Sequence, residues 1–156
     1  MSENQKTWEL VQVTRIIHFQ ADTPEATLRA SEVKPKLDRF LWRLAKLKVE
    51  ENRDWILKDT KALDYKMQIT APDREKAQKT SDFKDSTYFG NQGDGKHKKG
   101  ALKYNQPIKL KIICRHEELL TLLDQHLPIF FLTTNFGTRQ SKGWVHLSSK
   151  ILIWQC

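Results

Sequence analysis

The chain has 156 residues, a formal net charge of +8 and a sequence pI of about 9.5. Its hydrophobic fraction of 38% and aromatic fraction of 10% suit one globular domain, residues 1–156, with a single core. A positive excess of this size indicates a polyanionic partner, most commonly nucleic acid, although an acidic membrane or an acidic protein would also fit. No apolar stretch is long enough to span a bilayer.

Residues 1–7 are polar and lack the apolar centre of a signal peptide. The two cysteines, Cys114 and Cys156, form neither a metal-binding spacing nor a disulfide framework, so we expect a reducing, cytoplasmic environment and no metal or other cofactor. The motifs of zinc deaminases, serine hydrolases and phosphate-loop NTPases are absent from the sequence. The chain is therefore expected not to be an enzyme.

The first half of the chain predicts a strand, a helix and a second strand. Apolar and polar residues interleave over 8–20, which predicts a strand with a bulge. Ser31 is a candidate N-cap, Pro35 suits a first helical turn, and helical spacing predicts a helix over 36–48. Its expected apolar stripe is Leu37, Phe40, Leu41, Leu44 and Leu47. Strict alternation then predicts a strand over 63–70.

The second half repeats the pattern after a polar, lysine-rich stretch at 73–106, which we expect to be a flexible insertion. Strands are predicted over 107–115 and 145–154, and a helix over 116–127 that ends at Pro128, with either a further helical turn or a short strand over 129–133. The order βαββαβ is typical of an α+β, ferredoxin-like (RRM-type) domain. It predicts a four-stranded antiparallel sheet with two helices on one face.

The start of the first predicted helix is rich in cations. These residues are Arg29, Lys34, Lys36, Arg39 and Arg43. The free amide groups of a helix N-terminus also favour anions. The combination predicts an RNA-binding patch, although a basic helix face can equally serve only for solvation.

A glycine-bracketed loop, residues 135–146, carries a second group of cations. Glycine allows a close approach of the backbone to a ligand, and the neighbouring cations bind anions. The residues expected to grip phosphate are Gly137, Arg139, Lys142 and Gly143. The alternative is an ordinary turn whose charged tip serves solubility.

The insertion carries a third group of cations, Lys96, Lys98 and Lys99. Two aromatic residues, Tyr88 and Phe89, precede them and are suited to stacking on bases. The segment fits either an RNA-binding finger or a plain surface loop in which the aromatic residues anchor the chain.

Two further hypotheses compete with a non-catalytic RNA-binding role. His18, at the end of the first predicted strand, is a candidate general base for a metal-independent endoribonuclease that cleaves through the 2′-hydroxyl. The basic face could instead dock an acidic protein, as a protein-interaction module does.

Three segments together resemble the RAMP superfamily of CRISPR-associated proteins and, within it, the family of the first subunit of the Cmr (type III-B) effector complex. They are Thr27–Arg43, which leads into the first helix; Tyr88-Phe89-Gly90; and Phe136–Trp144, the glycine-rich loop. The resemblance implies a non-catalytic antiviral-defence subunit of a crRNA-guided ribonucleoprotein complex. It implies contact with single-stranded RNA, guide or target, and with other effector subunits.

Overall fold

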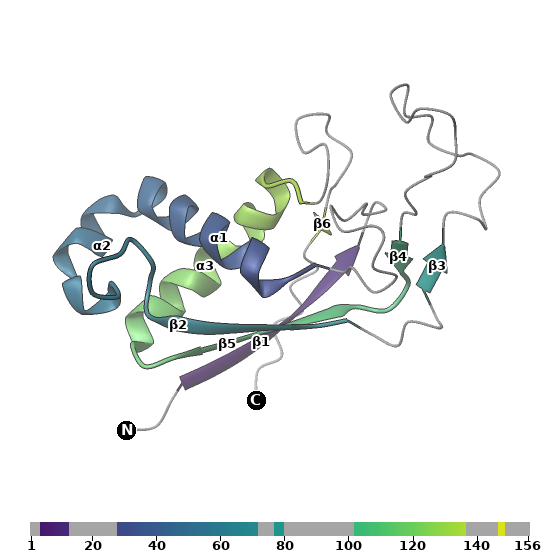
Figure 1. The fold of residues 1–156 in the computed structure, drawn as a ribbon, viewed down its shortest axis with the longest axis horizontal. Helices are drawn as coiled ribbons and strands as arrows, with labels where there is room; N and C mark the ends of the chain where they lie inside the picture. The colour runs from purple at the N-terminus through teal and green to yellow at the C-terminus, as the bar shows by residue number, and fades with distance from the viewer. Residues whose placement is uncertain (1–3, 13–27, 72–76, 80–101, 137–146, 149–156) are drawn as a thin grey trace.

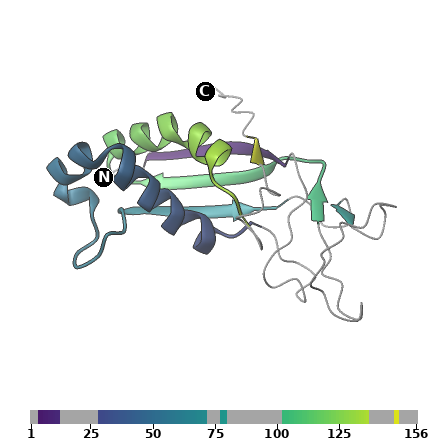
Figure 2. The same ribbon diagram turned by 90° about the horizontal axis from the view of Figure 1, so that it is seen from above.

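The computed structural model describes residues 4–12, 28–71, 77–79, 102–136 and 147–148 (Figure 1). Within these ranges the protein is an α+β fold, in which helices lie on one face of an antiparallel sheet (Figures 1 and 2). No helix among the described residues is long and apolar enough to cross a membrane.

The sheet is built from three long strands, β1 (Asn4–Gln12), β2 (Tyr65–Thr70) and β5 (Ile108–Cys114). β5 is central and pairs antiparallel with both neighbours, with Leu110 opposite Trp8 on one side and Ile69 on the other. The two-residue strand β6 (Leu147–Ser148) pairs with the end of β1, so the order is β2-β5-β1-β6. The antiparallel α+β class is thus confirmed, whereas the fourth predicted strand, 145–154, is described only over β6.

The alternation of apolar and polar residues predicted the second and third strands, 63–70 and 107–115, to within two residues of the observed β2 and β5. Along β5 the buried positions alternate with more exposed ones, because successive side chains point to opposite faces of a strand. β1 begins at Asn4, four residues before the predicted Trp8, because Lys6 and the residues before it still pair with β5. The predicted continuation of this strand to residue 20 lies outside the described residues.

The first predicted helix differs from the observed one at both ends. α1 (Ala30–Leu44) begins with Arg29 as its N-cap instead of Ser31, and Pro35 lies inside it. The early start buries Val33 fully, one turn before Leu37. The helix stops at Ala45, whose ψ of 34° departs from helical geometry, and a separate short helix, α2 (Lys46–Glu51), follows.

The break at Ala45 makes part of the predicted apolar stripe wrong. Leu37 and Leu41 are fully buried, as expected, but Leu44 is 56% exposed and Leu47 is 73% exposed. Leu44 is the last residue of α1, Leu47 lies in α2 beyond the break, and Val49 fills the core instead. A one-turn helix, η1 (Arg53–Trp55), then buries Trp55.

The prediction that Pro128 ends the second helix is also wrong, and of the two alternatives for 129–133 the helical turn is the one observed. α3 (Glu117–Thr133) runs through Pro128 for more than one further turn. Proline removes one backbone hydrogen bond from a helix interior. The continuation buries Phe130 and Phe131 completely, and burying a phenylalanine side chain is worth about 1.5–3 kcal/mol. Core packing therefore outweighs the local preference.

Both ends of the predicted insertion form strands. β3 (Ala77–Lys79) and β4 (Leu102–Tyr104) pair antiparallel, Ala77 opposite Tyr104, as a separate two-stranded sheet. These two short strands were not predicted from the sequence, and the flexibility of the insertion at 73–106 stays a prediction. Tyr104 is buried, and its backbone amide donates a 2.9 Å hydrogen bond to the side chain of Gln12 at the end of β1. The pair is therefore attached to the main sheet.

Candidate nucleic-acid interface

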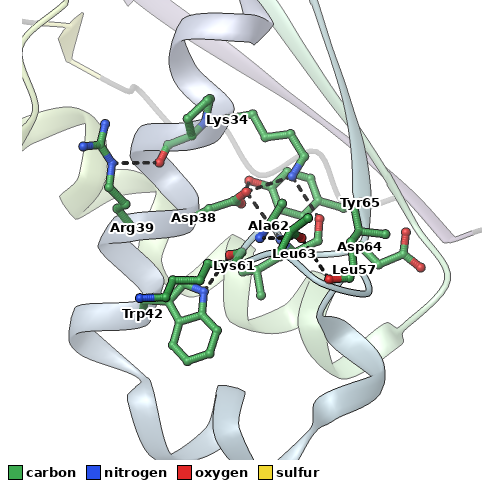
Figure 3. Close-up of polar contacts among 12 residues, drawn as sticks. Lys34, Asp38, Arg39, Trp42, Leu57, Lys61, Ala62, Leu63, Asp64 and Tyr65 are labelled. Atoms are coloured by element: carbon green, nitrogen blue, oxygen red, sulfur yellow. Dashed lines mark hydrogen bonds and ion pairs between the residues drawn. The ribbon is translucent and has the colours of Figure 1, made fainter.

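α1 presents two chemically different sides to its surroundings. Residues three or four positions apart share one face of a helix, so Lys36, Arg39 and Arg43 lie along one side, while Lys34 and Asp38 lie on another. Figure 3 shows Arg39 on the opposite side of α1 from Lys34, Asp38 and Tyr65. The five cations predicted from the sequence therefore do not form a single patch.

Lys34 is used inside the fold. Its Nζ donates to Asp38 Oδ2 and to the carbonyl oxygen of Leu63, both at 2.9 Å, and it lies 4.1 Å from the centre of the Tyr65 ring. These contacts tie α1 to the start of β2 (Figure 3). The charge of Lys34 is thus matched by Asp38, so the structure favours other cations as contacts for phosphate, and the prediction that Lys34 binds RNA stays a prediction.

Asp38 is the centre of this connection, and its side chain is 8% exposed. Besides Lys34, it accepts a 2.7 Å hydrogen bond from the Tyr65 hydroxyl and a 3.4 Å bond from the Leu63 amide. Burial, and then the charge of Asp38, raise the pKa of Tyr65 well above its ordinary value. Tyr65 therefore remains a neutral donor to a buried carboxylate.

Lys36 connects α1 to the segment that leads into the glycine loop. Its Nζ donates to Glu32 Oε1 at 3.1 Å and to the carbonyl oxygen of Asn135 at 2.9 Å, and it lies 4.7 Å from the centre of the Phe136 ring. The Lys36 side chain is 17% exposed. It fixes the last described residues before the loop beside the N-terminal half of α1.

Phe136 anchors the same segment in the core. It is fully buried, and its ring centre lies 5.8 Å from that of Phe130 and 5.6 Å from that of Phe131. Phe40 of α1 adds an edge-on contact to Phe130 at 5.3 Å. Such aromatic pairs contribute about 0.5–1.5 kcal/mol each beyond the area they bury. The start of the glycine loop is therefore held from two sides, by a cation and by a cluster of rings.

Three of the predicted cations, Arg29, Arg39 and Arg43, remain available along this side of α1, which we call the α1 edge. Arg39 and Arg43 are exposed, and the side chain of Arg39 makes one contact within the described structure, a 3.3 Å bond from Nε to the Pro35 carbonyl. Arg29 is half-buried at the helix start, where its backbone carbonyl accepts the Glu32 and Val33 amides at 3.0 Å. Within the described residues, Arg39 and Arg43 form no ion pair, so both guanidinium groups can meet phosphate.

The other predicted site residues lie outside the described residues. They are His18, Lys96, Lys98, Lys99, Gly137, Arg139, Lys142 and Gly143. Their predicted roles stay predictions. What the structure adds is the position of Phe136, the residue directly before Gly137, beside the basic side of α1.

The described residues contain two further groups of chemical interest. Burial is the main cause that raises the pKa of the Cys114 thiol, which lies 3.3 Å from the His116 carbonyl oxygen. His116 Nε2 lies 3.8 Å from Asp64 Oδ2 at the surface. Within the part of the chain that the structure describes, no three histidine, cysteine or acidic side chains gather as they would around a metal ion.

Sequence reasoning missed the structural roles of Asp38, Phe136 and Trp42. The spacing of Lys34 and Asp38, four residues apart on a helix, is the signal that could have indicated their ion pair. Trp42 donates from Nε1 to the Lys61 carbonyl at 2.8 Å and so holds the chain after η1 (Figure 3). No local pattern reveals that Phe136 enters the core, because the contact joins distant segments.

A comparison with protein-family models matches residues 3–150 to the family described as Cmr1 N-terminal domain. A search of curated proteins finds no match. The family match covers the N-terminal strand, both long helices and the glycine loop.

Proposed function

Since the chain belongs to the Cmr1 N-terminal domain family, we propose that it is a non-catalytic RNA-binding subunit of a crRNA-guided, type III CRISPR interference complex. The family match confirms the prediction of a Cmr1-like, type III-B CRISPR-associated protein and supports membership in a Cmr complex with other subunits. The proposal also includes RNA binding, the RAMP-type ferredoxin-like assignment with β6 as the fourth strand, and a cytoplasmic location.

One observation carries the RNA-binding part. Lys36 holds Asn135 beside α1, on the helix side that also presents Arg39 and Arg43. The glycine loop thus begins on the same side of α1 as two exposed guanidinium groups that have no ion-pair partner among the described residues. A strand of RNA that lies along α1 would meet these arginines and the start of the loop together.

The chemistry of this edge suits the phosphate backbone better than the bases. Guanidinium groups bind phosphate in a bidentate manner, and such contacts fix position and register without reading sequence. In this proposal the guide RNA supplies specificity by base pairing, as in other guided systems. Arg29, Arg39 and Arg43 contact the backbone from the helix, and Arg139 and Lys142 contact it from the loop.

The test is the salt dependence of binding to a labelled single-stranded RNA. Each phosphate contact that is lost lowers the slope of log K against log salt by about 0.7 for a single strand. Arg39→Gln with Arg43→Gln should therefore lower the slope by about 1.4, and Arg139→Ala with Lys142→Ala by about one to two.

The matched control is Arg53→Gln with Lys58→Gln, which removes the same charge from exposed positions on η1 and the turn after it. It should change the slope by much less. Equal losses in the helix pair (Arg39 and Arg43), the loop pair (Arg139 and Lys142) and the control would mean that RNA responds only to net charge, and would contradict the proposed site. Cleavage of the RNA by the wild-type chain would contradict a non-catalytic role, and its loss in His18→Ala would favour the endoribonuclease.

A further inference from the structure

The sheet has a second face, directed away from the helices. Trp8 shows which way the strands face, because its Nε1 donates a 2.8 Å hydrogen bond to Asp124 of α3. Its neighbours Thr7 and Glu9 therefore point to the other side. The same alternation along β2 and β5 places every second residue on this side, which we call the outer sheet face.

The strand register defines the outer sheet face residue by residue. It consists of three cross-strand rows that run from β2 across β5 to β1: Lys66, Ile113 and Gln5; Gln68, Lys111 and Thr7; Thr70, Lys109 and Glu9. Directly opposite residues in antiparallel strands have Cβ atoms about 5 Å apart. The rows therefore form one continuous surface.

The outer sheet face is basic. It carries Lys66, Lys109 and Lys111 against a single acid, Glu9. None of the three lysines forms an ion pair within the described part of the chain, although Glu9 is directly opposite Lys109. Lys66 and Lys109 are exposed and Lys111 is half-buried between its neighbours. Like charges on one face of a sheet repel one another, so a bound anion would stabilise this arrangement.

The described structure leaves this face uncovered. α1 contacts β2, and α3 contacts β1 and β5, all from the opposite side (Figures 1 and 2). No described helix or strand lies over the outer sheet face, and the rows contain no aromatic side chain. Bases therefore have no ring to stack on here, whereas hydroxyl and amide groups of Thr7, Thr70 and Gln68 can donate to phosphate and sugar oxygens.

We propose that the outer sheet face is a second RNA-binding surface, which holds the sugar–phosphate backbone of a single strand independently of base sequence. The inference rests on the proposed RNA-binding function but concerns a different surface from the α1 edge. The charge is complementary to a polyanion. A protein partner fits less well, because the centres of protein interfaces are depleted in lysine and enriched in aromatic residues.

The experiment compares two triple variants of the full chain. Lys66→Gln, Lys109→Gln and Lys111→Gln together remove the cations of the outer sheet face. Lys48→Gln, Lys58→Gln and Lys61→Gln remove the same charge from exposed positions on α2 and the following turn. Binding of a labelled, uridine-only single-stranded RNA is measured across salt, with thermal unfolding to confirm that both variants fold.

The sheet variant should bind roughly ten-fold more weakly at low salt, with a salt slope about two units smaller, since three contacts at about 0.7 each are lost. The control should lose much less. Photo-crosslinking of a 4-thiouridine RNA to the wild-type chain should mark peptides that contain β2 or β5.

Equal affinity and slope in the sheet variant and the wild type, in a chain that does bind RNA, would overturn this inference and leave the proposed function standing. Equal losses in the two triple variants would overturn it as well, since they would reflect net charge alone. A wild-type chain that binds no RNA would overturn both. Replacement of the uridine RNA by mixed sequences should leave the effect unchanged, and a strong sequence preference that disappears in the sheet variant would contradict backbone binding.

Discussion

Replacement of Asp38 by alanine should destabilise the protein strongly, because this buried carboxylate holds α1 to β2. The change leaves the Tyr65 hydroxyl without its 2.7 Å acceptor and Lys34 without its 2.9 Å ion pair. An unsatisfied buried hydroxyl costs about 1–3 kcal/mol, and removal of one partner of a buried ion pair costs about 3–5 kcal/mol. Because the Lys34 side chain is 23% exposed and keeps the Leu63 carbonyl, its share falls below the range for a fully buried pair, and we expect a total loss of about 3–4 kcal/mol.

The loss is large against the 5–15 kcal/mol by which most domains are stable. It is measured by urea unfolding followed through tryptophan fluorescence, with the free energy compared at equal m-values. A double-mutant cycle with Lys34→Met and Asp38→Leu isolates the pair, because the removal of both charges is often nearly neutral. The double variant should therefore be more stable than the sum of the two single changes.

A loss of less than about 1 kcal/mol in Asp38→Ala, or strict additivity in the cycle, would refute the account of this connection. The same cycle bears on RNA binding. Because Asp38 already matches the charge of Lys34, Lys34→Met should leave the salt slope for RNA unchanged while it lowers stability. A lower slope in this variant would return Lys34 to the RNA-binding surface.

Three further predictions test the fold and the site. Leu41→Ala should cost about 2–5 kcal/mol of stability, whereas Leu47→Ala, at a position 73% exposed, should change it by no more than about 0.5 kcal/mol; equal losses would contradict the break at Ala45. The pKa of Tyr65 is raised, so the unfolded chain loses the hydroxyl proton at a lower pH than the folded chain. The contribution of Tyr65 to stability is therefore complete below about pH 10, and stability falls above it by up to about 1.4 kcal/mol per pH unit. Tyr65→Phe should reduce that alkaline slope in urea titrations at several pH values, and an unchanged slope would count against a buried, neutral Tyr65. Lys36→Met should weaken RNA binding and cost about 1–2 kcal/mol of stability through the lost bonds to Glu32 and Asn135, whereas unchanged affinity would separate the loop from the α1 edge.

The local patterns of the sequence identified most of the regular elements. The strands at β2 and β5 followed from strict alternation, which reports directly on a half-buried sheet. The helix boundaries did not follow, because they depend on packing between distant segments. Pro128 is a helix breaker by itself, yet Phe130 and Phe131 beyond it fill the core and keep α3 intact.

The candidate site, too, was only partly predictable from the sequence. The sequence identified the cations of α1, but only the three-dimensional contacts distinguish Lys34 and Lys36, which serve the fold, from Arg39 and Arg43, which face outward. The four-residue spacing to Asp38 and Glu32 could have indicated the two ion pairs, but the bonds to the Leu63 and Asn135 carbonyls join segments that are distant in sequence, and no local pattern reveals them. The outer sheet face likewise could not be predicted from the sequence, because only the strand register shows which residues of the three strands lie side by side.

The most direct test of the central claim is binding of the purified wild-type chain to a labelled single-stranded RNA, titrated across salt in the presence of duplex DNA. The account predicts binding that resists the duplex competitor, weakens steeply with salt and leaves the RNA intact. Weak binding that duplex DNA removes would contradict it, because the charge of +8 would then act without a specific surface.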